Sequence, residues 1–366
     1  MTQSTQQLLK TLGIQHPIIL APMAGATNAD IVAKVSNAGG LGSFGAASTK
    51  PEQLRVLIRD IRERTDLPFN INLFSGSTEK YDHSVAAGDA ISQRYRDWHT
   101  ELELDNTPQP IALFGPAEEQ LDVLISEKVP VISFHFGVDQ PALKRAQQSG
   151  ATVLCSATSV CEAVFLEKQG VDIVIAQGAE AGGHRGTFIG DYRDSLIGTF
   201  ALVPQIVDAV NCPVIAAGGI MDARGIVAAL TLGASAAQMG TAFLGCTESK
   251  IPTAWVKSLK NAEADQIAVT EVISGKPARG IKNRFIDELE TINDGLLPYP
   301  AHYSLSRLIR AKAAKENDAD FLAMWSGQGV GLFKETTVET LMQELLTNSE
   351  TLLGHRELAA VFRKSI

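Results

Sequence analysis

The chain has 366 residues, of which 45% are hydrophobic and 20% charged, a balance typical of a globular protein with material for one large domain or two medium ones. Its net charge of −9 argues against a general nucleic-acid or anionic-membrane surface. The four cysteines form no CxxC pair, which argues against a structural metal site and a disulfide framework.

The scattered cysteines also indicate that the protein resides in a reducing compartment. A secretory signal has a basic region followed by a long apolar core, and the N-terminus has no such pattern. No uninterrupted apolar run reaches membrane-spanning length. We therefore expect a cytoplasmic protein without a membrane partner.

Eight short apolar segments recur along the chain with helical material between most of them. The predicted strands are residues 17–21, 41–44, 69–74, 130–136, 151–157, 172–176, 213–217 and 234–239. Eight strands alternating with amphipathic helices predict an α/β fold, a closed (β/α)8 TIM barrel. A doubly wound open sheet is the alternative, but its GxGxxG fingerprint is missing after the first strand, where Pro22-Met23-Ala24-Gly25 stands.

Two stretches depart from this alternation. Residues 75–129, after the third strand, contain Ser/Gly-rich turn material, a polar helix around 89–104, a Pro-containing turn and a further helix, which predicts an insertion on the functional face or rim. Residues 247–366 are predicted to be mostly helical, with breaks at 275–277, 297–300 and 327–331. We therefore divide the chain into a barrel domain, residues 1–246, and a C-terminal region that covers the barrel's open face or packs back on it.

The stretch 173–190, IVIAQGAEAGGHRGTFIG, places a histidine where barrel enzymes do chemistry. A buried strand ends near Gln177, and the pair Gly182-Gly183 then allows a tight turn or a close approach to a ligand. His184 follows, and its pKa near neutrality suits proton transfer. The alternative from this segment alone is a Gly-rich turn with a solvated His-Arg tip.

The ends of the last two strands carry glycines at positions where barrel enzymes bind phosphate. Gly218-Gly219 and Gly240-Thr241 present bare N–H groups one βα unit apart, although two tight turns would give the same pattern. Asp222 is placed to cap the next helix. Asn72 and Gln177 can each donate and accept, as the pyrimidine edge of a flavin requires, but either amide, like His135, is also typical of a core position.

These residues resemble the nitronate monooxygenase family, formerly called 2-nitropropane dioxygenases, from about residue 10 to about residue 333. The matching motifs are APMAGATN, NINLF, SFHFG, AQGAEAGGHRGTF, AAGGI, QMGTAFL, ARGIKNRF and WSGQGVGL. The GGH motif is shared with flavin-dependent quinone reductases and enoyl-ACP reductases. AEAGGHRGTF and the C-terminal tyrosine and Trp-Ser-Gly-Gln segments are more similar to the first class of nitronate monooxygenases.

The resemblance implies FMN as cofactor and roles for individual residues. His184 would be the catalytic base or the cation facing a nitronate, and Met23 would lie beside the isoalloxazine. The implied cofactor-binding residues are Ala21, Pro22, Met23, Asn72, Gln177, Gly182, Gly218, Gly219, Gln238, Met239, Gly240 and Thr241. His135, Tyr299 and Tyr303 would line the substrate pocket. Arg307 stands where the family commonly has lysine; it keeps the charge but changes the reach and the hydrogen-bond geometry, which leaves the substrate preference open.

The implied reaction is oxidative denitrification of alkyl nitronates such as propionate 3-nitronate, with O2, to a carbonyl compound and nitrite. The alternative is an NAD(P)H-dependent FMN reductase of quinones or enoyl thioesters. In such a reductase, NADH would quickly bleach the flavin under nitrogen. A non-catalytic barrel that binds a phosphate ligand is a third hypothesis, which a colourless purified protein would favour. The sequence leaves the oligomeric state open, a homodimer included.

Overall fold

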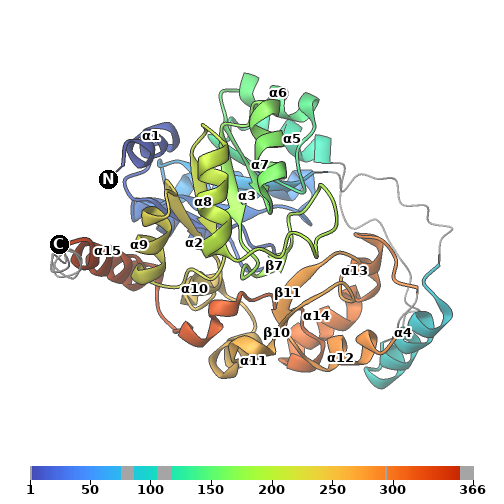
Figure 1. Cartoon of the computed structure of the whole chain (residues 1–366). Helices are drawn as coiled ribbons and strands as arrows, with labels where there is room; N and C mark the ends of the chain where they lie inside the picture. The colour runs from blue at the N-terminus through green and yellow to red at the C-terminus, as the bar shows by residue number, and fades with distance from the viewer. Residues whose placement is uncertain (1, 76–85, 105–116, 293–294, 355–366) are drawn as a thin grey trace.

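The computed structural model describes residues 2–75, 86–104, 117–292 and 295–354. The Pro-containing turn predicted in the insertion lies outside these residues, as does most of the Ser/Gly-rich turn. Figure 1 shows a barrel, in blue to yellow, with a second layer of mostly orange segments against one of its ends.

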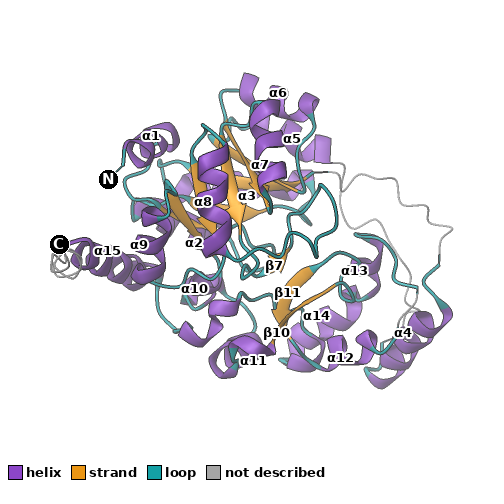
Figure 2. Ribbon diagram, in the orientation of Figure 1, coloured by secondary structure: helices purple, strands orange, loops and turns teal. Residues whose placement is uncertain are grey.

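Eight parallel strands form the predicted barrel (Figure 2). They are β1 (Ile18–Leu20), β2 (Gly42–Gly45), β3 (Phe69–Phe74), β4 (Val131–His135), β5 (Thr152–Ala157), β6 (Ile173–Gln177), β8 (Val214–Ala217) and β9 (Ala236–Met239). β9 pairs with β1, and a parallel bridge from Ile19 to Leu41 joins β1 to β2. The ring is therefore closed, which excludes the doubly wound sheet.

Helices surround the barrel because each carries one apolar face. They are α2 (Ala29–Asn37), α3 (Pro51–Arg64), α5 (Ala117–Ser126), α6 (Gln140–Gln148), α7 (Val160–Gln169), α8 (Thr199–Ala209), α9 (Ala223–Thr231) and the short α10 (Thr241–Leu244). Polar side chains cap several of them, and Asp222 caps α9 by accepting from the backbone N–H of Arg224 at 2.9 Å, as predicted.

The first helix, α1 (Gln3–Leu12), plugs the barrel at the end opposite the predicted site. Its Leu8 and Leu12 join a core cluster with inward-facing strand residues such as Ile19, Ile173 and Ile215. The neighbouring strand residues, Val174 among them, point outward into the helix-facing core, because successive side chains of a strand alternate. The closed lower end leaves the C-terminal ends of the strands as the barrel's open face.

A second layer covers that open face, and we call it the lid: residues 251–292 and 295–333 together with α4 (Asp89–Glu101). It contains α11 (Thr253–Asn261), α12 (Arg284–Glu290), α13 (Ala301–Leu305) and α14 (Arg307–Glu316), and the short 3-10 turns η2 (Ala264–Gln266), η3 (Ala319–Phe321) and η4 (Gln328–Leu332). Tyr95 and Trp98 of α4 pack against Phe285 of α12 in a separate apolar core. The insertion after the third strand therefore contributes to the lid.

The prediction of a mostly helical C-terminal region is confirmed, and one segment departs from it. β10 (Ile267–Thr270) and β11 (Ala278–Ile281) form an antiparallel hairpin, and β11 also pairs with β7 (Gly183–His184). Each strand has only four residues, too few for an alternating pattern to stand out in the sequence. Through β7 this small sheet connects the lid to the barrel.

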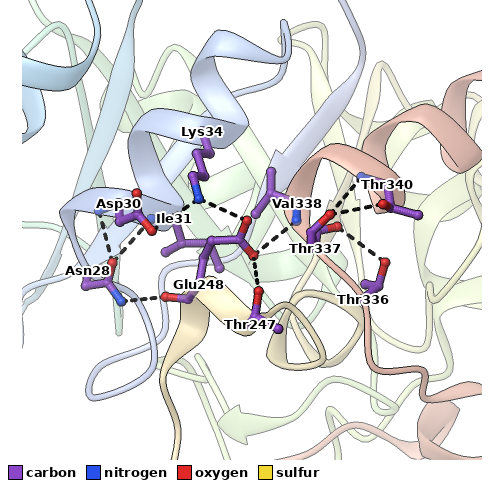
Figure 3. A network of polar contacts seen from close by, with 10 residues as sticks. All are labelled: Asn28, Asp30, Ile31, Lys34, Thr247, Glu248, Thr336, Thr337, Val338 and Thr340. Carbon is purple, nitrogen blue, oxygen red and sulfur yellow. Dashed lines mark hydrogen bonds and ion pairs between the residues drawn. The ribbon is translucent and has the colours of Figure 1, made fainter.

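The chain then returns to the barrel through α15 (Val338–Gly354), which packs against α9 and α2 (Figure 1). Figure 3 shows the contact that fixes this return: the buried carboxylate of Glu248, in η1 (Thr247–Ser249), accepts from Lys34 of α2 at 3.2 Å and from the backbone N–H of Val338 at 3.2 Å. The division at residue 246 stays a prediction. Among the described residues no helix has the length and apolarity needed to cross a membrane.

Candidate active site

A cavity of about 570 Å³ lies between the open face of the barrel and the lid. This volume is in the range of small-molecule sites. Sixteen of the seventeen residues that the sequence singled out line it: Ala21, Pro22, Met23, Asn72, His135, Gln177, Gly182, His184, Gly218, Gly219, Gln238, Gly240, Thr241, Tyr299, Tyr303 and Arg307. The structure therefore brings together residues that lie almost 290 positions apart in the chain.

Met239 is the exception. Its side chain is fully buried in the core between the barrel and its helices. Alternation along β9 explains the difference, because Gln238 points into the barrel mouth and the next residue must then point away. The structure does not bring the Met239 side chain to the cavity.

One corner of the cavity is built from backbone. Gly218 and Gly219 have φ angles of +123° and +69°, conformations that strongly favour glycine. The N–H groups of Gly219, Gly240 and Thr241 take part in no backbone hydrogen bond with another described residue. The Thr241 hydroxyl oxygen accepts from the N–H of Gly327 at 2.9 Å, which leaves its proton available to a ligand. This corner fits a phosphate group, whose oxygens only accept.

Three amide side chains from the barrel strands also reach the cavity. The buried Oε1 of Gln238 has no hydrogen-bond partner among the described residues, and a buried polar atom without a partner is rare. Oδ1 of Asn72 accepts from Ser133, while its NH2 group donates to no described residue. A ring with both donors and acceptors on its edge, such as a flavin, would satisfy both amides.

Gln177 is already engaged by the protein. Its Nε2 donates to the carbonyl oxygen of His184 at 2.9 Å, and its Oε1 accepts from the N–H of Gly186 at 2.8 Å. Both ends of the amide therefore hold the segment that carries His184. The sequence could show an amide at this strand end but not the direction of its side chain.

His184 lies in the short strand β7, where the sequence predicted a loop. β7 pairs with β11 of the lid, so backbone hydrogen bonds fix the position of the imidazole. Aromatic rings surround it: the centroid of Tyr299 lies at 5.3 Å, that of Trp325 at 5.5 Å and that of Phe74 at 5.9 Å. Burial, followed by the charges of His135 and Lys276, lowers the pKa of His184 to about 3. The imidazole is therefore neutral at neutral pH, the state a base requires.

His135 lines the cavity, as predicted, but both of its ring nitrogens are engaged. Nε2 lies 3.1 Å from the carbonyl oxygen of His184, and Nδ1 lies 2.6 Å from Oγ of Ser156. Burial lowers its pKa to about 4. His135 is therefore a neutral ring that supports the His184 segment, and neither nitrogen is available to take a proton from a ligand.

The alternative of a solvated His-Arg tip is wrong for this segment. Arg185 is fully buried, and its guanidinium donates to the carbonyl oxygens of Gly178 at 2.6 Å, Gln177 at 3.1 Å and Ser195 at 3.3 Å. These bonds fix the end of β6 below the cavity. Only the tertiary structure shows that the arginine points inward.

The lid supplies the opposite wall. Tyr299 and Tyr303 come from the segment around α13, and burial raises the pKa of Tyr299 well above its usual value, so its phenol stays protonated. Arg310 stacks on the ring of Tyr303 at 3.7 Å and donates to the Tyr303 carbonyl oxygen and the Ser306 hydroxyl. Arg307 lines the cavity and is exposed. Among the described residues neither arginine pairs with a carboxylate.

The sequence did not identify several residues of the site. Phe74, Trp325 and Arg310 line the cavity, and Ser274 lies behind His184. Arg310 lies one helical turn after Arg307, so the spacing was a signal for it. Phe74 ends a predicted strand and Trp325 opens a quoted motif, whereas nothing in the sequence distinguished Ser274.

The comparisons with known proteins agree with this geometry. The model of the nitronate monooxygenase family matches residues 5–348. The chain belongs to the nitronate monooxygenase family. Two relatives described as probable nitronate monooxygenases are 38% identical, in Staphylococcus saprophyticus (94% of this chain and 97% of the relative), and 39% identical, in Staphylococcus haemolyticus (95% and 98%).

Solved structures show the same similarity. A nitroalkane oxidase from Streptomyces ansochromogenes is 33% identical with a TM-score of 0.84, covering 95% of this chain and all of that one. FabK from Thermotoga maritima is 29% identical with a TM-score of 0.75, covering 98% and 99%. The resemblance inferred from the sequence motifs is thus confirmed, and this member of the nitronate monooxygenase family is an oxidoreductase.

Proposed function

We propose that the protein binds FMN in this cavity and uses O2 to convert alkyl nitronates into carbonyl compounds and nitrite. The phosphate would occupy the corner formed by Gly218, Gly219, Gly240 and Thr241, where the N–H groups of the last three donate to no backbone acceptor among the described residues. Asn72 and Gln238 would meet the edge of the ring. A flavin held there would supply the redox chemistry between the substrate and O2.

The observation that carries this proposal is the position of the His184 imidazole, which lines the cavity and is held there by the pairing of β7 with β11. Neutral nitroalkanes must lose an α-proton before oxidation, and a neutral imidazole can accept that proton. A nitronate has already lost it, so the same ring then contributes a hydrogen bond and position. Tyr299, Trp325 and Phe74 surround the ring with aromatic surface.

The arginines of the lid support an anionic substrate. Arg307 and Arg310 line the cavity without a carboxylate partner among the described residues. Arg310 is held by three contacts, whereas Arg307 is exposed and can follow a ligand. In propionate 3-nitronate two carbons separate the nitronate nitrogen from the carboxylate, and this second negative charge would be attracted to this wall.

Mixing the purified protein with a nitronate in air tests the proposal. We expect a flavin absorption spectrum, O2 consumption and release of nitrite, together with FMN on denaturation. Release of FAD, or no nitrite from any nitronate, would contradict it. Rapid bleaching by NADH under nitrogen would instead favour a reductase of quinones or enoyl thioesters.

A further inference from the structure

Ser274 lies directly behind His184 and makes three hydrogen bonds. Its Oγ lies 3.0 Å from Nε2 of His184 and donates to the carbonyl oxygen of Lys276 at 2.9 Å, while the N–H of Lys276 donates to it at 3.3 Å. Ser274 is 1% exposed, so water does not compete for its hydroxyl. These contacts are not explained by the role of any residue described above.

The other two hydrogen bonds of Ser274 indicate which nitrogen of His184 carries the proton. A serine hydroxyl has one proton and two acceptor lone pairs. The proton goes to the carbonyl oxygen of Lys276, and one lone pair accepts the N–H of Lys276, so the second can only accept a proton from Nε2.

We propose that Ser274 is a positioning residue: it fixes His184 in the tautomer with the proton on Nε2, so that the unprotonated Nδ1 faces the cavity as the base. Nδ1 has no hydrogen-bond partner among the described residues, and it is not among the buried atoms without partners, so it is open to the cavity that His184 lines. This assignment rests on the proposed function only for the identity of the substrate.

The second histidine shows why the polarity of the serine matters. Nε2 of His135 faces the carbonyl oxygen of His184, which can only accept, so the proton of this ring is also on Nε2. Its serine partner, Ser156, lies at Nδ1 and must donate to it. The two serines thus bind opposite nitrogens. Ser156 donates to the unprotonated Nδ1 of His135, whereas Ser274 accepts from Nε2 of His184 and leaves its Nδ1 without a partner among the described residues.

The segment that carries Ser274 is held rigidly. The N–H of Gly275 donates to the carbonyl oxygen of Glu271 at 2.7 Å, and Gly275 has a φ of +77°. A Cβ at Gly275 would lie 2.1 Å from the carbonyl oxygen of Leu297, so glycine allows this turn to pack against the segment before Tyr299. The lid therefore fixes the orientation of a histidine that belongs to the barrel.

The spectrum of ¹⁵N-histidine-labelled protein tests the proposal directly. In the wild type we expect His184 to show a single tautomer, protonated at Nε2. In Ser274→Ala we expect His184 to show both tautomers. Ser274→Thr keeps the hydroxyl and should restore the single tautomer. Ser156→Ala is the matched control, because it should change the signals of His135 and leave those of His184 in place. A single Nε2–H tautomer in Ser274→Ala would overturn the assignment; if that variant does not fold, Ser274→Cys serves instead.

Kinetics provide a second readout. Loss of one hydrogen bond that selects the tautomer should lower kcat/KM for a neutral nitroalkane by about two- to tenfold, with a smaller change for the preformed nitronate. An equal loss for both substrates would indicate a merely structural role and overturn the proposal. If the wild type oxidised neither substrate but the tautomer still changed in Ser274→Ala, the proposed function would fail while the role of Ser274 stood.

Discussion

The barrel wall and the lid wall of the cavity are built in different ways. The barrel side offers backbone N–H groups on glycines and amides at strand ends, positions fixed by a closed parallel sheet. The lid side offers long side chains, among them Tyr303, Arg307 and Arg310, on short helices and turns. The first arrangement suits one fixed ligand with a phosphate, and the second suits a small, variable anion.

This contrast between backbone groups and side chains predicts which wall changes when substrate specificity changes. Contacts from backbone N–H groups depend on the register of the strands, so they change only when the strand pairing of the barrel changes. Side-chain contacts from the lid can change one residue at a time, and an exchange between arginine and lysine at position 307 would keep the charge but change the hydrogen-bond geometry. His184 belongs to both walls, because β7 leaves the barrel and pairs with β11 of the lid.

The largest expected effect is on the barrel wall. Gly219→Asp would place a carboxylate where the phosphate is proposed and force a non-glycine residue into φ +69°. We expect complete loss of flavin, measured as bound flavin per protein after gel filtration. Gly190→Asp is the control, because Gly190 has a similar φ of +81° on the exposed surface away from the cavity. A fully loaded Gly219→Asp protein would refute the phosphate site.

At the junction of the two walls, His184→Asn should separate two substrates. Removal of a general base lowers the rate by about a hundredfold to ten-thousandfold, so turnover of nitroethane should nearly vanish. Turnover of preformed ethylnitronate should fall less, because no proton needs to be removed. Flavin content should stay unchanged, since the phosphate corner comes from other strands. Wild-type oxidation of nitroethane by the variant would exclude His184 as the base.

On the lid wall, Arg307→Met should weaken only carboxylated substrates. Loss of a charge-assisted hydrogen bond is worth about 1.5–3 kcal/mol, which corresponds to an increase of about 10- to 150-fold in KM for propionate 3-nitronate. The value for ethylnitronate should change little, and Arg307→Lys should recover part of the loss. Equal changes for both substrates would remove Arg307 from the binding site.

The last expected effect concerns the stability of the lid and not the binding of a ligand. His302 is fully buried, its Nε2 lies 2.8 Å from the Val272 carbonyl oxygen, and burial lowers its pKa to about 4 from the ordinary 6.5. Between these two pH values the unfolded state binds more protons, so the free energy of unfolding falls as pH drops, by about 1.4 kcal/mol per pH unit for this group. His302→Gln should reduce that slope by one proton in urea unfolding from pH 6.5 to pH 4, and an unchanged slope would contradict the assignment.

The sequence predicted the barrel well because its signals are local. Strand, helix and turn alternate in each βα unit, and the predicted strand 69–74 agrees with β3 to the residue. The glycine pairs after the last two strands were also visible, because a backbone that must adopt positive φ requires glycine regardless of its neighbours.

The sequence by itself therefore determined the barrel, the family and which residues gather at the open face. Only the tertiary structure decided the direction of individual side chains: Arg185 points inward to three carbonyl oxygens, Gln177 holds the His184 segment, and Met239 faces the core. It also decided the lid hairpin that brings Ser274 to His184, 90 residues away. These features depend on contacts between distant segments, and local periodicity carries no information about such contacts.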